Sequence, residues 1–152
     1  SYRNEHVIPM MRFRHYILCL SLSMLCTSLL SPADELAERM MKTVDLSGSG
    51  FLDCDWTIRK GSSMIFASGA LKESKEEAVS IQILLRDDPE GTSKGYDERS
   101  NGYPARRISN RKVWVIIGRI EARVSIFNAD LQSDTKLDEI IARLNPSQLE
   151  SL

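Results

Sequence analysis

The sequence predicts an α+β domain. In chain order it consists of a helix, an antiparallel sheet of four to five strands, and a C-terminal helix packed on one face of the sheet. Three observations carry this prediction. Apolar residues recur at helical spacing in residues 34–44 and 134–144. Between these segments, short runs alternate apolar and polar residues, which is typical of half-buried strands. The third observation is an apolar run at residues 16–30, which has the pattern of a secretory leader outside the domain.

The apolar run is preceded by Arg12 and Arg14 and followed by the small residues of Ser31-Pro32-Ala33. A basic start, an apolar middle and a small-residue exit are the three regions of a signal peptide. The run is shorter than the roughly 20 residues that a membrane span needs. We therefore expect a leader that is removed after Ala33, and no stable membrane span afterwards. A retained anchor and a core helix are the alternatives.

The leader prediction divides the chain into two regions. Residues 1–33 comprise the signal peptide and, before the Met10-Met11 pair, residues that look like upstream sequence. Residues 34–152 are expected to form one α+β domain that is periplasmic or secreted. A domain of this length can bury a core without disulfides.

The leader contains most of the residues that commonly perform catalysis or bind metals. Both histidines, His6 and His15, precede Ala33, and so do Cys19 and Cys26. The remaining domain has Cys54 as its only cysteine and no histidine. This composition excludes an internal disulfide, a histidine-based triad and a histidine-ligated metal site in the domain. We expect a protein that is not an enzyme, and we keep a carboxylate-based enzyme using Asp53 and Asp55 as an alternative.

The first helix, residues 34–44, leads into a ligand-like segment at residues 45–56. Aligned with the calcium loop of an EF-hand, the segment offers oxygens at positions 1, 3, 5 and 9 and glycine at position 6. The residues at the four oxygen positions are Asp45, Ser47, Ser49 and Asp53. Trp56 stands where the pattern requires a bidentate glutamate. A degenerate calcium site is therefore an alternative to an ordinary Gly/Ser-rich connection, which we prefer.

The middle of the chain is expected to form the sheet. Strands are predicted at residues 54–59, 63–71, 78–85, 105–117 and 120–127. A charged connector is expected at residues 72–77 and a long loop at 86–104, with a strong turn signal at Asn101-Gly102. Gly118-Arg119 suits a type II′ turn. Because Val113 to Ile117 is apolar at every position, we expect both faces of this strand to be covered, one by helix and one by sheet.

The closing helix is expected to be capped by Ser133 or Asp134 and to end at Asn145-Pro146. Its apolar stripe consists of Leu137, Ile140, Ile141 and Leu144. Residues 147–152 are expected to add a last turn that docks Leu149 and Leu152.

The end of the chain also carries a resemblance. Gly118-Arg119 leads into a strand, a polar break follows at Gln132-Ser133-Asp134, and the helix is followed by Leu149-x-x-Leu152. This pattern resembles the C-terminal part of small exported bacterial proteins of unassigned function, over residues 102–152. Those proteins often place an aromatic residue where this chain has Ile120. The resemblance implies an exported α+β domain and brings no catalytic residues with it.

Charge is distributed unevenly along the domain. Residues 34–152 hold 17 basic and 20 acidic side chains, but residues 99–124 hold seven basic and one acidic. The basic residues proposed as a binding patch are Arg106, Arg107, Arg111, Lys112, Arg119 and Arg123. We expect this patch to bind an anionic envelope component or a protein partner, and not nucleic acid, because the domain as a whole is slightly acidic. The alternative is a polar sheet face neutralised by the protein's own acidic segments.

Overall fold

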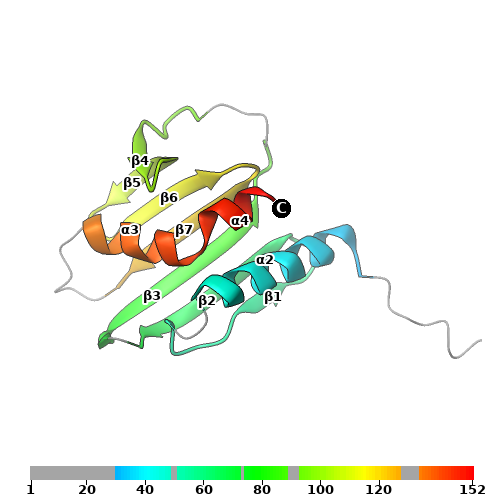
Figure 1. Ribbon diagram of the computed structural model, residues 1–152, viewed down its shortest axis with the longest axis horizontal. Helices are drawn as coiled ribbons and strands as arrows, with labels where there is room; N and C mark the ends of the chain where they lie inside the picture. The colour runs from blue at the N-terminus through cyan, green and yellow to red at the C-terminus, as the bar shows by residue number, and fades with distance from the viewer. Residues whose placement is uncertain (1–29, 49–50, 73, 89–92, 128–133) are drawn as a thin grey trace, which may run out of the picture. The chain divides into compact units, whose positions relative to one another are not determined.

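The computed structural model describes residues 30–48, 51–72, 74–88, 93–127 and 134–152 (Figure 1). Residues Ser31–Leu152 form one compact unit, distinct from Ser1–Leu30. Nearly all of the predicted leader lies outside the described residues. Within the described ranges, no helix combines the length and apolar character needed to cross a membrane.

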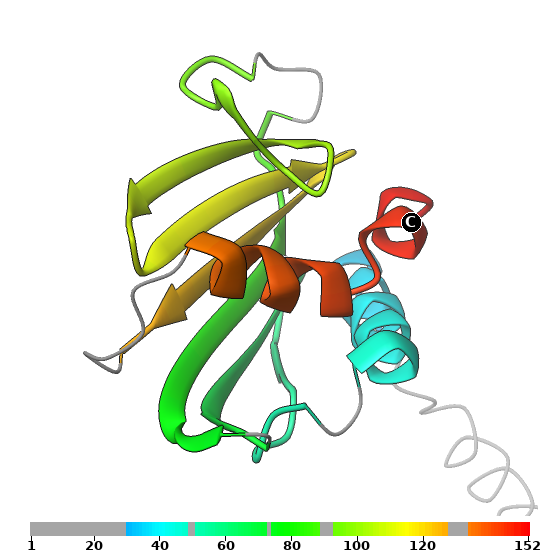
Figure 2. The same ribbon diagram turned by 60° about the vertical axis from the view of Figure 1, so that its left-hand side comes forward.

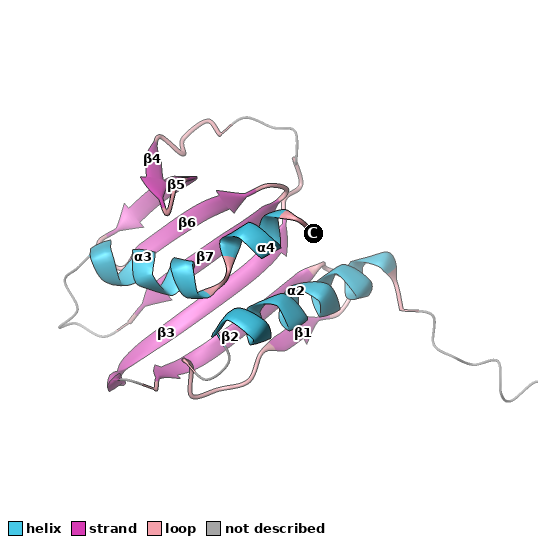
Figure 3. Cartoon of the chain, in the orientation of Figure 1, coloured by secondary structure: helices cyan, strands magenta, loops and turns pink. Residues whose placement is uncertain are grey.

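The domain is α+β with an antiparallel sheet, as the sequence predicts, but the sheet is larger than expected. It has seven strands instead of four to five (Figure 3). The strands are β1 (Thr57–Arg59), β2 (Met64–Leu71), β3 (Ser74–Leu85), β4 (Glu98–Ser100), β5 (Tyr103–Ser109), β6 (Lys112–Ile117) and β7 (Ile120–Ile126).

Two turn signals account for the additional strands. Asn101 and Gly102 both adopt positive φ, 51° and 85°, which is the requirement of a type I′ hairpin turn, and this turn joins β4 to β5 inside the predicted long loop. The predicted strand at residues 105–117 is two strands, β5 and β6, joined through Asn110 and Arg111. The predicted connector at residues 72–77 is also wrong in part, because β3 begins at Ser74.

The strands are arranged as two antiparallel meanders that meet at β3 and β7. Their order in the sheet is β1-β2-β3-β7-β6-β5-β4. After β3 the chain passes to the opposite edge of the sheet, where β4 begins, and returns strand by strand to β7 (Figure 1). The last hairpin has the predicted turn at Gly118-Arg119, and of the two residues only Gly118 has positive φ (60°), as a type II′ turn requires.

In the part of the chain that the structure describes, three helices accompany the sheet: α2 (Pro32–Gly48), α3 (Asp134–Arg143) and the short α4 (Pro146–Glu150). Helix α2 contacts β1 and β2, α3 contacts β7, and α4 contacts β6. Figure 2 shows them on the same face of the sheet. The apolar stripe of α3 (Leu137, Ile140 and Ile141) and Leu144 directly after the helix are buried in the same core cluster as the strand residues.

The two faces of the sheet differ because side chains alternate along each strand. On β3, Val79, Ile81 and Ile83 are buried in the core shared with the helices, and we call this side the helix face. The intervening residues of the central strands lie on the other side, which we call the open face. Its residues are Met64, Phe66, Ser68, Ser80, Gln82, Leu84, Lys112, Trp114, Ile116, Glu121, Arg123, Ser125 and Arg106.

The expectation that both faces of residues 113–117 are covered is only partly met. Val113, Val115 and Ile117 are buried on the helix face, and Ile116 is buried on the open face. Trp114 on the open face is half-buried. All named strands of the described chain belong to one sheet, so no second sheet covers this strand within the described ranges.

A polar network attaches α3 to the β4–β5 hairpin. Asp138 on α3 accepts hydrogen bonds from the Ser100 hydroxyl at 2.6 Å and from Arg107 Nη2 at 3.0 Å. Arg107 Nε in turn lies 3.0 Å from a carboxylate oxygen of Glu98. Since Ser100 is buried, Asp138 satisfies a hydroxyl that has little access to water.

We expect Asp138→Ala to lower the free energy of unfolding by about 1–3 kcal/mol, because it leaves the Ser100 hydroxyl without its acceptor. Glu139→Ala is the matched control on the same helix. Glu139 is exposed, and its Oε2 atom forms a surface ion pair with Lys136 Nζ at 3.7 Å, so its removal should change stability by less than about 0.5 kcal/mol. Urea denaturation of both variants checks the prediction, and equal losses would contradict the role assigned to Asp138.

Candidate anion-binding face

Three cationic side chains surround one tryptophan on the open face. The guanidinium carbon of Arg123 lies 4.5 Å from the centre of the Trp114 ring, the amino group of Lys112 lies 5.7 Å from it, and the guanidinium carbon of Arg106 lies 5.9 Å from it. These distances are within the range of cation–π attraction. We call these four residues the Trp114 cluster.

The register of the central strands builds the cluster. Trp114 on β6 pairs with Arg123 on β7 and with Arg106 on β5, so the three side chains stand side by side on one face. Lys112 lies two residues before Trp114 on β6 and therefore on the same face.

The other three residues of the predicted basic patch lie elsewhere. Arg107 is on the helix face and is paired with Glu98 and Asp138. Arg119 is in the β6–β7 turn, where its Nη2 donates to the carbonyl oxygen of Leu152 at 2.9 Å. Arg111 is in the β5–β6 turn. The structure therefore brings Arg106, Lys112 and Arg123 together around Trp114, and it places Arg107 on the other face and Arg111 and Arg119 in turns.

The cluster carries positive charge that the described residues compensate only in part. Arg123 forms an ion pair with Glu121, through its Nε and the Oε1 atom of the carboxylate. Within the described part of the chain, neither Arg106 nor Lys112 has a carboxylate within ion-pair distance. Trp114 Nε1 is also buried and has no acceptor among the described residues, which is uncommon for an indole N–H.

A buried glutamate, Glu121, holds Arg123 of the cluster in place. Glu121 is only 6 % exposed, and its Oε2 atom accepts a hydrogen bond of 2.5 Å from the hydroxyl of Tyr96. Tyr96 comes from the segment before β4, so this bond ties that segment to β7. Burial, followed by the hydrogen bond to Glu121, raises the pKa of Tyr96 to about 12. The sequence offered no signal for this contact, because Tyr96 lies in the predicted loop.

The raised pKa of Tyr96 has a consequence for stability at high pH. In the unfolded chain the phenol ionises near its ordinary pKa of 10, whereas in the folded protein it stays protonated to about 12. The contribution of Tyr96 is therefore fully present below pH 10 and is lost as the pH rises to about 12. We expect denaturation midpoints to fall more steeply across this window in the wild type than in Tyr96→Phe. Parallel curves for the two proteins would contradict the Tyr96–Glu121 contact.

A polar pocket lies beside the cluster, at the end of β3. Its volume is about 140 Å³, and it is lined by Leu84, Leu85, Arg86, Asp87, Asp88, Glu121 and Arg123. The volume is below the roughly 300 Å³ at which small-molecule sites begin. The carboxylates expected for the enzyme alternative, Asp53 and Asp55, are exposed and do not line this pocket.

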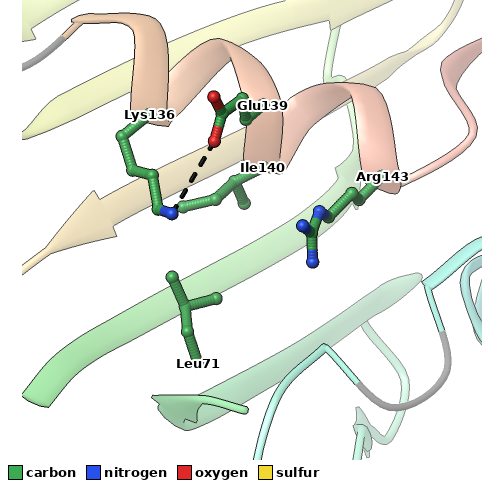
Figure 4. A pocket seen from close by; sticks show the side chains of 5 residues that line it. All are labelled: Leu71, Lys136, Glu139, Ile140 and Arg143. Carbon is green, nitrogen blue, oxygen red and sulfur yellow. Dashed lines mark ion pairs between the residues drawn. The ribbon is translucent and has the colours of Figure 1, made fainter. Parts of the chain in front are cut away.

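A second, much smaller pocket lies on the helix face between α3 and β2 (Figure 4). It is lined by Leu71, Lys136, Glu139, Ile140 and Arg143, and the Lys136–Glu139 ion pair spans its upper side in the figure. Its volume of about 10 Å³ is at the lower limit of the space that one water molecule needs. This pocket offers no room for an organic ligand.

The predicted calcium loop lies partly outside the described residues. Helix α2 runs through Gly48, so the first four positions of the loop pattern, including Asp45 and Ser47, are helical. Ser49 lies outside the described residues. Leu52, at position 8 of the loop pattern, forms a β-bridge with Leu71 at the end of β2. Asp53, at position 9, is exposed. Among the described residues, no group of three or more acidic, histidine or cysteine side chains is placed to hold a metal ion.

Comparisons of this chain with protein-family models, with curated proteins and with solved structures find no match. The resemblance to small exported bacterial proteins thus stays a prediction, and the candidate site rests on its own geometry.

Proposed function

We propose that this protein is a non-catalytic binding domain that recognises an anionic component of the cell envelope through the Trp114 cluster. The observation that carries the proposal is the placement of Arg106, Lys112 and Arg123 around one half-buried tryptophan on the open face. A cationic group near a low-dielectric aromatic surface attracts anions more strongly than the same group in water.

The incomplete neutralisation of the cluster supports this proposal over the alternative of a merely polar sheet face. Glu121 compensates Arg123, but among the described residues Arg106 and Lys112 have no carboxylate partner. An anionic ligand would supply the missing charges. The leader pattern supports a periplasmic or secreted location. The absence of histidine after Ala33 supports a binding role over histidine-based catalysis.

A carboxylate-based enzyme is the second candidate, and one observation favours it. Asp87, Asp88 and Glu121 line the same polar pocket, and of the three only Glu121 is buried. The small volume of the pocket and the engagement of both Glu121 oxygens by Tyr96 and Arg123 rank it below the binding function.

Tryptophan fluorescence tests the proposed function. In the Trp56→Phe variant, Trp114 is the only tryptophan. Titration with polygalacturonate, an acidic polysaccharide, should change its emission in a saturable way, and added salt should weaken the binding because the attraction is between charges. An unchanged emission, or an affinity that salt does not alter, would contradict the proposal.

A further inference from the structure

Side chains on the open face form two rows that run across the strands, perpendicular to their direction. The central row crosses six strands through successive paired positions. Its members are Thr57, Phe66, Gln82, Arg123, Trp114 and Arg106. The Trp114 cluster therefore lies at one end of the row, and Phe66 lies toward the other end. Phe66 is 39 % exposed, so part of its ring is accessible to a ligand on the open face.

The second row is rich in hydroxyl groups and lies beside the central row. Ser68 pairs with Ser80, Ser80 with Ser125, and Ser125 with Lys112. Lys112 belongs to the Trp114 cluster, so the two rows meet there. Each serine offers both a donor and acceptors for hydrogen bonds. We call the two sets the central row and the serine row.

From these rows, and resting on the proposed function, we infer that the ligand is an extended acidic polysaccharide that lies across the strands. The carboxylates of its sugars would pair with Arg106, Lys112 and Arg123. Its hydroxyl groups would bond to the serine row and Gln82, and the apolar face of one ring would stack on Phe66.

The dimensions of the rows favour a polymer over a single headgroup. Neighbouring strands are about 4.8 Å apart, so Phe66 and Arg106, four strands apart, are separated by roughly 19 Å along the central row. A sugar unit in an extended chain advances by about one strand spacing. One anionic group could contact the Trp114 cluster but could not reach Phe66 at the same time.

The experiment compares oligogalacturonates of two lengths, a dimer and a hexamer, on the full chain. We expect the hexamer to bind at least about tenfold more tightly than the dimer, because it engages additional subsites on one surface. Phe66→Ala should reduce hexamer affinity by about fivefold to tenfold and leave dimer affinity unchanged. Phe127→Ala is the matched control. Phe127 is another exposed phenylalanine, follows β7 and belongs to neither row, so its removal should alter neither affinity.

The outcomes separate the polymer inference from the proposed function. If dimer and hexamer bind equally and Phe66→Ala changes neither, the polymer is excluded while anion binding at the Trp114 cluster stands. If neither oligomer binds, the proposed function fails as well. A single-stranded oligodeoxynucleotide of equal charge that binds more tightly than the hexamer and displaces it would also overturn the inference, since stacking and cations recognise nucleic acid too.

Discussion

Replacing Arg106 and Lys112 together by glutamate should lower the affinity for polygalacturonate by about a hundredfold, which corresponds to roughly 2.7 kcal/mol. The double substitution removes two positive charges beside Trp114 and puts two negative ones in their place. Neither residue forms an ion pair within the described chain, and Arg106 is exposed, so the fold should tolerate both changes. We leave Arg123 in place because its loss would remove the ion-pair partner of the buried Glu121 carboxylate.

The matched control is Lys42→Glu/Lys72→Glu. Both lysines are exposed and lie outside the Trp114 cluster, and the change in net charge is the same. We expect this variant to lose only a small part of the affinity, through the weaker overall attraction of the protein for a polyanion. Titration of both variants at one fixed salt concentration gives the comparison. Equal losses would mean that net charge, not the cluster, determines binding.

Ile83→Ala should lower the free energy of unfolding by about 2–5 kcal/mol. Ile83 has no exposed surface and lies on β3, which joins the two meanders of the sheet. Its register partners are Ile65 on β2 and Ala122 on β7, so the truncation leaves a cavity beneath the helices at the centre of the core. Urea denaturation measures the loss.

Gln82→Ala is the control for Ile83→Ala, because Gln82 is the adjacent residue and points to the open face. Its truncation should change stability by no more than about 0.5 kcal/mol. Comparable losses at residues 82 and 83 would contradict the assignment of the two faces. The same variant should weaken binding of the hexamer, because Gln82 belongs to the central row.

Much of the fold follows from periodic patterns in the sequence. Alternation predicted β2, β3 and β7, and the Gly118-Arg119 turn placed β6 beside β7. Strand β4 was missed because Glu98, Arg99 and Ser100 show no apolar alternation. The turn signal at Asn101-Gly102 was visible, but nothing in the sequence indicated that three polar residues before it would pair with β5.

The candidate site was predicted in part, for a similar physical reason. The six basic residues of the predicted patch lie close together in the sequence, but the face of the sheet that each one occupies depends on the strand register. A β-bulge between Arg107 and Ser109, and the turns around Arg111 and Arg119, decide which side chains reach the open face. In the sequence, Trp114 is one residue of an apolar strand and carries no sign of a binding role. Its pairing with Arg123 follows from the register of the two-residue turn at Gly118-Arg119. Its pairing with Arg106 depends on the β5–β6 hairpin, which the sequence indicated as one strand region.

The indole N–H of Trp114 offers the most direct measurement of the central claim. It is buried, has no acceptor within the described ranges and belongs to a ring that three cationic side chains contact. An anionic ligand that engages those side chains should therefore shift its NMR resonance. During titration of the full chain with hexagalacturonate, we predict a saturable shift of the Trp114 indole signal and of the backbone amides of Gln82 and Arg123. The Trp56 indole and the amides of α3 should not move. A stationary Trp114 signal, or shifts confined to α3, would contradict the account.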